Sequence, residues 1–398
     1  MFKPYEYKMG KICSRCVMDD SVMGIEFDKD GECTFCKIHD EMIKKYPLND
    51  ESAHELKEII EKIKKDGKGK KYDCIVGVSG GRDSTYTLFN AVKLGLRPLA
   101  VHFDNGWNSE IAVQNIKNAC KILNVDLYTL VADWEEFKDL QKSFLKASVS
   151  DGEVPTDWVI TSVLYKLAAR EKVKYFIGGH SFRTEGTTPL SWTYQDGRYV
   201  RSIHKKFGTK KIKSFPIMSL IEYAYYTFVK RIEYVRLLYY IPYDKDKVLD
   251  IMKKELKWSN YGGKHFESTY TNFYQSYVLT RKFNIDKRKL HMSALIRSGQ
   301  LNRTDALKIL NTDPFQGGKE LLYYTIKKLD MTIEEFDSIM AAPTKNFMDY
   351  PSMYSLIKKN EKLVKFAAHL KLIPQVLVHK YFSFNYDEVE DNENNTIL

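Results

Sequence analysis

Residues Ser79–Ser84, of sequence SGGRDS, have the types and spacing of a phosphate-binding loop. They follow an apolar, strand-like run and open a helix-like one. Gly80 and Gly81 allow a tight turn in which successive N–H groups point into one concavity that suits an anion. A helix starting near Ser84 adds the positive end of its dipole, and the hydroxyls of Ser79 and Ser84 add donors. We therefore expect Ser79, Gly80, Gly81 and Ser84 to bind the phosphates of a nucleotide.

The two charged residues of this loop point to phosphate chemistry. Arg82 offers a positive charge, and Asp83 beside phosphates is expected to hold Mg²⁺, which prefers hard oxygen ligands. The spacing GxxxxGK[ST] and the Lys of a Walker A motif are absent. The loop resembles instead the SGGxDS loop of the PP-loop ATP pyrophosphatases, which cleave ATP between its α- and β-phosphates and leave an adenylated substrate. That resemblance implies ATP and Mg²⁺ as cofactors, with Arg82 and Asp83 in catalytic roles.

Two CxxC pairs near the N-terminus predict a metal site. Each CxxC turn presents two sulfurs to one point, and tetrahedral Zn²⁺ takes four ligands. Because four thiolates leave no open coordination position, we expect a structural zinc ribbon, with redox chemistry or nucleic-acid contact as the functional alternative. The expected ligands are Cys13, Cys16, Cys33 and Cys36.

Strands and helices alternate from residue 72 onward, which predicts a parallel sheet wound with helices. The strands are expected in YDCIVGVSGG, PLAVHFDNGW, VDLYTLVAD and VKYFIGGH, and helices at about 84–94, 109–123, 134–146 and 156–172. Ligands of such sheets bind beyond the carboxyl ends of the strands. The fold class is therefore α/β, of the adenine nucleotide alpha hydrolase or PP-loop type.

Two more of these strand ends carry candidate residues. Asp104 and Trp107 follow the second strand, where the superfamily usually holds the adenosine. Trp107 is expected either to stack on the base or to pack in the core. Gly179 and His180 end the fourth strand, where we expect them near the pyrophosphate or the activated substrate, with Arg183 beyond them as a substrate ligand.

The composition describes a globular protein with anionic partners. The 398 residues are 43% hydrophobic and 29% charged, and the formal net charge is +10. This balance excludes a disordered or fibrous chain and favours nucleotides, nucleotide sugars, RNA or acidic proteins as partners. We expect no membrane span, no signal peptide and a cytoplasmic location, because no apolar stretch is long enough for either segment.

Changes in composition and hydrophobic pattern along the chain predict five parts. After the sheet-forming part the sequence turns mostly helical and rich in Tyr and Phe, and it ends in an acidic, polar run. We expect a zinc ribbon at 1–48, a helical connector at 49–71, a PP-loop ATP pyrophosphatase domain at 72–215, a helical substrate or partner domain at 216–385 and a disordered acidic tail at 386–398.

Two segments of the helical part gather small, basic and titratable residues. They are 258–268, WSNYGGKHFES, and 282–300, KFNIDKRKLHMSALIRSGQ. By composition they fit an anionic-ligand surface or a helical bundle with charged faces equally well. Together with the cysteine pairs, SGGRDS and the GGH at 178–180, they resemble the N-acetyl sugar amidotransferase family of WbpG- and PseA-like proteins over residues 10 to 315.

This resemblance implies a reaction on an acetamido group of a sugar or nucleotide sugar, in surface-polysaccharide or nonulosonic-acid biosynthesis. The acetamido oxygen would attack the α-phosphate of ATP, and ammonia would then displace AMP to give an acetamidino group. The catalytic candidates in addition to the loop are His180, Lys264 and His265, and the substrate-binding candidates are Arg183, Glu267, Arg288, His291 and Arg297.

Ammonia must then come from elsewhere. Residue 2 is Phe, so the N-terminal Cys nucleophile of one glutaminase class is missing, and Cys74 lies in a strand-like run with no nucleophile elbow. We expect a separate glutaminase subunit, since members of the family are often paired with glutaminase and cyclase-like subunits.

Two other functions compete. A tRNA-modifying enzyme, through sulfur transfer or a related modification, would also combine a zinc ribbon with a PP-loop, and the basic charge favours it. Many thiolases, however, need catalytic cysteines, and only Cys74 and Cys120 remain, not as a pair. Nucleic acid is therefore not the expected partner. A third possibility is a nucleotide-binding interaction module without catalysis.

Overall fold

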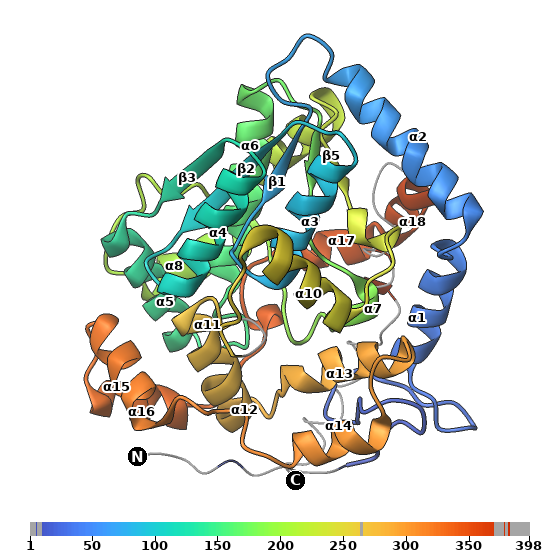
Figure 1. Cartoon of the computed structure of the whole chain (residues 1–398). Coiled ribbons are helices and arrows are strands. Elements are labelled where there is room, and N and C mark those ends of the chain that lie inside the picture. Colours follow the sequence, from blue (N-terminus) through green and yellow to red (C-terminus); the bar gives the residue numbers. More distant parts are fainter. Residues whose placement is uncertain (1–4, 6–9, 263–265, 370–377, 379–380, 383–398) are drawn as a thin grey trace.

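A five-stranded, fully parallel sheet forms the centre of the protein in the computed structural model, which describes residues 5, 10–262, 266–369, 378, 381 and 382 (Figure 1). The strand order is β3-β2-β1-β4-β5. The strands are β1 (Cys74–Gly77), β2 (Pro98–Asp104), β3 (Leu127–Val131), β4 (Tyr175–Ile177) and β5 (Glu233–Val235). The predicted α/β class and the four predicted strands are confirmed.

The fifth strand was not predicted. β5 is only three residues long, begins with Glu233 and lies inside a Tyr-rich run that favours a helical interpretation. It pairs with β4 in the register Phe176↔Tyr234. The sheet therefore extends beyond residue 215, where we expected the α/β domain to end.

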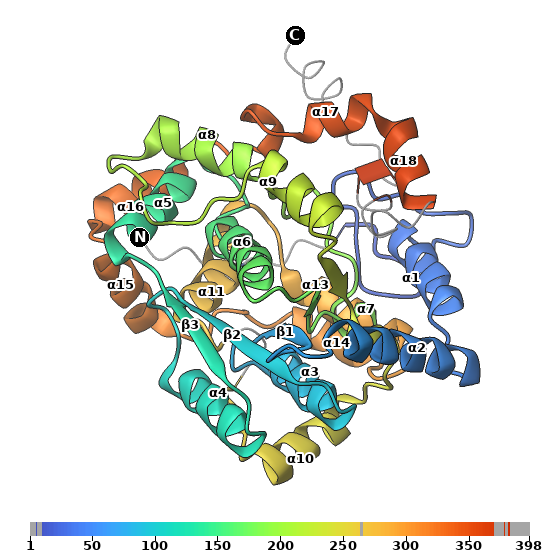
Figure 2. The same ribbon diagram turned by 90° about the horizontal axis from the view of Figure 1, so that it is seen from above.

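Helices cover both faces of the sheet, as Figure 2 shows. Residues in register share a face, so Val101 and Tyr128 belong to one side and Ala100 and Leu127 to the other. One face carries α3 (Arg82–Lys93), α4 (Glu110–Ile122) and α10 (Lys245–Leu256), and the other carries α5 (Trp134–Lys146), α6 (Val154–Arg170) and α8 (Gly197–Phe207). The sheet is thus buried on both sides along its central strands, which explains their nearly continuous apolar sequences.

Side-chain caps fix several of the predicted helix starts. Ser109 accepts a hydrogen bond from the N–H of Ala112 at the start of α4, and Asp133 accepts from two N–H groups at the start of α5. The connector helix α2 (Asp50–Asp66) begins with a capping box formed by Asn49 and Ser52. These residues satisfy N–H groups that no helical carbonyl can reach.

The C-terminal half is mostly helical, as predicted, and its core is aromatic. Tyr270, Phe273 and Tyr277 form one buried row, in which Phe273 stacks on Tyr277 and lies tilted against Tyr270. Its helices are α7 (Phe182–Glu185), α9 (Leu220–Ala224), η1 (Tyr225–Val229), η2 (Leu237–Tyr239), α11 (Thr269–Phe273), η3 (Tyr274–Val278), α12 (Leu279–Lys282), α13 (Lys287–Arg297), α14 (Arg303–Leu310), α15 (Gly318–Lys328), α16 (Ile333–Ala341), η4 (Phe347–Asp349), α17 (Tyr354–Lys359) and α18 (Glu361–His369). The acidic tail predicted at 386–398 lies outside the described residues.

The N-terminal part is small and contains one helix, α1 (Thr34–Lys45). Two isolated bridges, Ile12↔Asp19 and Phe27↔Cys33, hold its loops together. Figure 1 shows α1 and α2 along one side of the molecule, with α13 and α14 beside the N-terminal loops. In the part of the chain that the structure describes, every helix is too short or too polar to cross a membrane.

Candidate active site and metal centre

The phosphate loop connects β1 to α3 at the carboxyl edge of the sheet. Gly80 has φ of +78°, a left-handed conformation that favours glycine. The two serine hydroxyls of the loop bind its own backbone. Ser84 Oγ accepts from the N–H of Ser79 at 3.1 Å, and Ser79 Oγ accepts from the N–H of Gly81 at 3.2 Å. The loop is thus a turn of clustered N–H groups at the start of a helix, which is a geometry that suits an anion.

The outer side of the loop is held by two other elements. A Cβ on Gly80 would stand 2.2 Å from the carbonyl oxygen of Ala112 on α4, so only glycine fits there. The carbonyl oxygen of Gly80 accepts from Trp258 Nε1 at 3.0 Å and from Asn115 Nδ2 at 3.3 Å. The loop is therefore positioned before any ligand binds.

A tyrosine that the sequence did not indicate connects the two charged loop residues. The hydroxyl of Tyr243 accepts from Arg82 Nε at 2.7 Å and donates to Asp83 Oδ1. Arg82 Nε also lies 3.0 Å from Asp83 Oδ1. Oδ2 of Asp83 has no hydrogen-bond partner among the described residues, so this oxygen fits the role of a Mg²⁺ ligand.

The end of β4 lies against the same loop. A Cβ on Gly179 would stand 3.0 Å from the backbone N of Ser84, so β4 approaches the first turn of α3 closely. His180 follows, with Nε2 3.1 Å from the carbonyl oxygen of Gly186 and Nδ1 3.2 Å from the hydroxyl of Tyr239. Because a carbonyl can only accept, Nε2 donates to Gly186, and in the neutral ring Nδ1 accepts from Tyr239.

The segment at 258–268 also reaches the loop. The point where a Cβ of Gly81 would lie is 3.0 Å from Glu267 Oε1 and 3.2 Å from the hydroxyl of Tyr261. The backbone of Glu267 is held by α4, since its carbonyl oxygen accepts from the N–H of Ser109 at 2.8 Å. Two expected catalytic residues, Lys264 and His265, lie outside the described residues.

The end of β2, where we expected the adenosine to bind, carries Asp104 and Trp107. Trp107 is 1% exposed, donates from Nε1 to Gln141 Oε1 at 2.8 Å and packs against Trp134, so it does not stack on a nucleotide base. Of the two roles expected for Trp107, packing in the core is the one that the structure shows, and its assignment to the nucleotide is corrected. Asp104 lies at the end of β2 as predicted, and its Oδ1 accepts from Asn108 Nδ2 at 3.0 Å.

Two of the expected substrate-binding arginines serve the fold instead. Arg183 is 5% exposed, and its guanidinium donates to the carbonyl oxygens of Tyr239 and Tyr46. Burial lowers the pKa of Arg183 to about 10. Arg288 donates to Asp286 Oδ2 at 2.7 Å and to the carbonyl oxygen of Thr312 at 2.9 Å. Each guanidinium is engaged by internal acceptors, which corrects their assignment to substrate.

The other two candidates lie on α13, which runs beside α1 and α7. His291 is half-buried in the middle of this helix. Arg297 donates from Nε to the carbonyl oxygen of Ser293 at 3.0 Å, and its Nη2 would stand 3.5 Å from a Cβ on Gly186. Arg297 lines a very small cavity of about 10 Å³ together with His39, Met42 and Phe182. Arg297 is thus a neighbour of the loop that follows His180.

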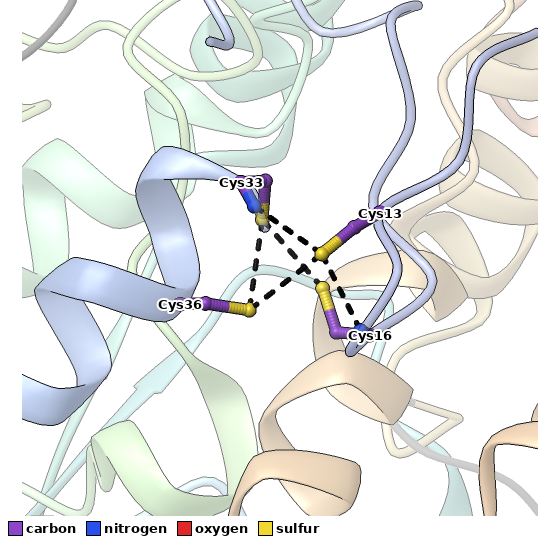
Figure 3. A group of neighbouring side chains, drawn as sticks. All are labelled: Cys13, Cys16, Cys33 and Cys36. Atoms are coloured by element: carbon purple, nitrogen blue, oxygen red, sulfur yellow. Dashed lines mark hydrogen bonds between the residues drawn. The ribbon is translucent and has the colours of Figure 1, made fainter. Parts of the chain in front are cut away.

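The four predicted cysteines converge on one point (Figure 3). All ligand atoms lie within 4.8 Å of one another, and all four side chains are buried. The Sγ atoms of Cys13 and Cys36 are 3.8 Å apart, and those of Cys16 and Cys33 are 3.6 Å apart. A tetrahedron with Zn–S bonds of about 2.3 Å has edges of about 3.8 Å, so the four sulfurs fit one zinc ion.

An iron–sulfur cluster does not fit the same sulfurs, because several irons would need their cysteines farther apart. Backbone N–H groups of Cys16 and Cys33 point to Cys13 Sγ at 3.4 and 3.3 Å, as is favourable for a thiolate. His39 is absent from the group, so it is not a fifth ligand.

This cysteine cluster is bound to α13 and α14. Arg303 donates from Nη2 to the carbonyl oxygen of Cys13 at 2.9 Å and from Nε to that of Cys16 at 3.0 Å. Lys289 and Asp19 form a buried ion pair at 2.5 Å. The segment 282–300 therefore connects the metal centre to α7 and the end of β4, a role that its composition did not reveal.

Comparison with known proteins adds a family for part of the chain. The loop, the parallel sheet and the cysteine cluster define an α/β protein with a phosphate loop and an N-terminal group of four cysteines that could hold a metal ion. Residues 267–363 match the model of the family described as "LPS biosynthesis protein WbpG-like, C-terminal domain". The resemblance to WbpG-like proteins is thus confirmed over this segment, which begins at Glu267 beside the phosphate loop.

Among curated proteins, an uncharacterized protein of Methanocaldococcus jannaschii, MJ1599, is 31% identical over 175 residues, covering 42% of this chain. This chain spans 58% of the length of that relative. Two solved structures are more distant. NMN synthetase from Francisella tularensis is 14% identical with a TM-score of 0.35, covering 70% of this chain and 97% of that protein. The U34-tRNA thiolase NcsA from Methanococcus maripaludis, solved with its [4Fe-4S] cluster, is 15% identical with a TM-score of 0.29, covering 76% of this chain and 89% of that protein.

Proposed function

We propose that this chain is an ATP-dependent amidotransferase that converts the acetamido group of an N-acetyl sugar or nucleotide sugar into an acetamidino group. One observation carries the proposal. Glu267, the first residue of the WbpG-like segment, lies against Gly81 of the phosphate loop. The part of the chain with a family link to lipopolysaccharide synthesis thus meets the part that suits ATP. A sugar bound by the first would lie next to a nucleotide bound by the second.

In the first step the acetamido oxygen attacks the α-phosphorus of ATP. The bond from that phosphorus to the bridging oxygen breaks, and pyrophosphate leaves with the electron pair. The N–H groups of the loop and the start of α3 would bind the departing phosphates, and Arg82 would add charge. Mg²⁺ held by Asp83 would supply further neutralisation when bound.

In the second step ammonia attacks the carbon of the adenylated imidate, the added nitrogen gives up a proton, and AMP leaves to give the amidine. His180 is the described candidate for that proton, because it lies at the end of β4 beside the loop. Its Nδ1 accepts from Tyr239 in this structure, so it would have to exchange that bond for one to ammonia. Catalytic roles for Lys264 and His265 stay part of the proposal.

Ammonia would be supplied by a separate glutaminase subunit, together with a cyclase-like subunit. The described cysteines give no nucleophile for glutamine, because the four of the cluster converge on a metal site and the other two are buried. Burial raises the pKa of Cys74 well above its usual value and raises that of Cys120 to about 11. Neither is a thiolate at neutral pH.

The same burial counts against the tRNA-thiolating alternative, which would need a reactive cysteine. Cys74 lies inside β1, and Cys120 lies on α4 and is buried in the core between that helix and the sheet. A filter assay tests this alternative directly. Salt-sensitive, submicromolar tRNA binding would favour it over the sugar substrate.

The decisive experiment incubates the purified chain with ATP, Mg²⁺, ammonium chloride and a panel of acetamido sugars and nucleotide sugars. We expect ATP–pyrophosphate exchange with one of them, release of AMP, and a product lighter by about one mass unit, since an oxygen is replaced by NH. Exchange with none of the sugars would contradict the proposal, and absence of exchange with tRNA as well would favour a nucleotide-binding interaction module.

A further inference from the structure

The edge strand β3 is the least protected part of the sheet. Its five residues, LYTLV, contain no charge and no proline, and β2 is its only strand neighbour among the described residues. Figure 2 shows it at the outer margin of the sheet, next to α4. Natural edge strands usually carry a Lys, a Pro or a bulge that prevents pairing with another chain. The lack of these devices suggests that β3 is covered in solution.

The backbone of β3 has a regular open side. The N–H of Ala100 donates to the carbonyl oxygen of Asp126 at 2.9 Å, and the N–H of Ala132 donates to that of Asp104 at 2.8 Å. Because hydrogen bonding alternates along a strand, the even-numbered residues of β3 face β2. Leu127, Thr129 and Val131 therefore direct their N–H and C=O groups toward the open edge.

The same residues carry the exposed apolar side chains. Leu127 is 39% exposed and Val131 is 67% exposed, on the sheet face that also bears α4. Ile111 and Ile122, near the two ends of α4, are exposed as well. Tyr128 and Leu130 point to the other face and pack on the core. The open hydrogen bonds and the uncovered apolar surface thus coincide.

We propose that β3 pairs antiparallel with β3 of a second copy of this chain, around a twofold axis at Thr129. In that register Leu127 lies opposite Val131 of the second copy, and Thr129 lies opposite its equivalent. All three pairs are of the hydrogen-bonded type, in which two residues exchange both main-chain bonds. Asp126 lies opposite Ala132, so no like charges meet.

Helix α4 supports the same axis by its charge. The twofold axis places the α4 helices of the two copies antiparallel. Each α4 has Glu110 in its first turn and Lys121 in its last turn. The acidic end of one helix then faces the basic end of the other, and Ile111 and Ile122 cover the cross-strand pairs between them. A self-complementary surface of this kind is what a twofold interface requires.

The dimer would join the two five-stranded sheets into one. Antiparallel pairing turns the carboxyl edges of the two sheets to opposite sides, so the two phosphate loops open away from each other. Each candidate active site then stays accessible to a substrate or a further protein. The inference does not depend on the proposed function.

Light scattering coupled to size exclusion tests the pairing. The wild-type chain should elute at twice its 46.5 kDa. The double variant Leu127→Lys/Val131→Lys opposes lysines across both outer pairs and removes their apolar contact, so dimer dissociation should rise by at least about a hundredfold. The matching Leu127→Glu/Val131→Glu variant should also be monomeric, and an equal mixture of the two should restore a dimer.

Ile221→Lys is the matched control, because Ile221 is 82% exposed on α9 and lies away from β3. It should leave the dimer intact. Circular dichroism checks that each variant is folded, which is expected because the replaced side chains face solvent in the single chain. A monomeric wild-type chain, or a dimer that survives both double variants, would overturn the proposal.

Discussion

The hydroxyl of Tyr243 donates to Asp83 Oδ1 and so joins the segment after β5 to the first turn of α3. The oxygen of the Tyr243 hydroxyl also accepts a hydrogen bond from Arg82 Nε. One hydroxyl therefore fixes both charged side chains of the phosphate loop. Burial and the carboxylate of Asp83 together raise the pKa of Tyr243 far above its usual value. The hydroxyl therefore stays protonated and acts as the donor to Asp83.

Tyr243→Phe should slow ATP–pyrophosphate exchange without unfolding the protein. A hydrogen bond to a charged group contributes about 1.5–3 kcal/mol, so the rate should fall about 10- to 100-fold. Tyr240→Phe is the control, since the hydroxyl of Tyr240 binds Glu55 far from the loop. Equal rates for the two variants would show that Tyr243 does not position Asp83.

Gly80→Ala should damage the loop more than the same change at Gly69. Both glycines have nearly the same φ, +78° and +77°, so an alanine at either position carries the left-handed penalty of about 1–2 kcal/mol. Only a Cβ on Gly80 would meet a neighbour, the carbonyl oxygen of Ala112 at 2.2 Å, whereas a Cβ on Gly69 would have nothing within 4 Å. We expect a further loss of about 1–3 kcal/mol in urea unfolding for Gly80→Ala, and weaker ATP binding by calorimetry.

Cys16→Ser should remove the metal and loosen the N-terminal part. Mass spectrometry of the metal content should find one zinc per wild-type chain and none in the variant. Because metal binding at such a site contributes folding free energy, thermal unfolding should shift to lower temperature. Cys120→Ser is the control, as this buried cysteine lies apart from the cluster. Full zinc content in Cys16→Ser would exclude the four-cysteine site.

His39 should make stability depend on pH below neutrality. Burial lowers the pKa of His39 to about 3, so the folded protein keeps it neutral while the unfolded chain, with a usual His value, binds a proton as pH falls. Stability is then complete above about pH 6.5 and declines below it.

Between pH 7.5 and 5.5 the loss from His39 should be about 1.4 kcal/mol, measured by urea unfolding with zinc in excess. The variant His39→Gln keeps a polar side chain of similar size but cannot titrate, so its stability should change less over the same interval. Identical slopes for the two proteins would mean that His39 has the same pKa in the folded and the unfolded state.

Much of the candidate site could be predicted because its signals are local. SGGRDS carries its turn, its helix start and its charges within one short segment, and the two CxxC pairs bring two sulfurs each to one place by backbone geometry alone. The alternation of strands and helices likewise follows from local periodicity, and it indicated β1 to β4 and the carboxyl edge where the loop lies.

What could not be predicted depends on contacts between distant segments. Trp107 and Arg183 have types that suit ligands, yet Gln141 engages the first and the carbonyl oxygen of Tyr239 engages the second. Tyr243 gave no signal, because a single tyrosine in a Tyr-rich run has meaning only once β5 places it beside Asp83.

The sequence by itself thus determined the kinds of chemistry available: a phosphate loop, a four-thiolate metal centre and a parallel sheet to hold the loop. Only the tertiary structure decided which charged residues remain for ligands and which ones bind the protein itself. The physical reason is that a buried polar group must find a partner, and that partner is chosen by packing across the whole fold.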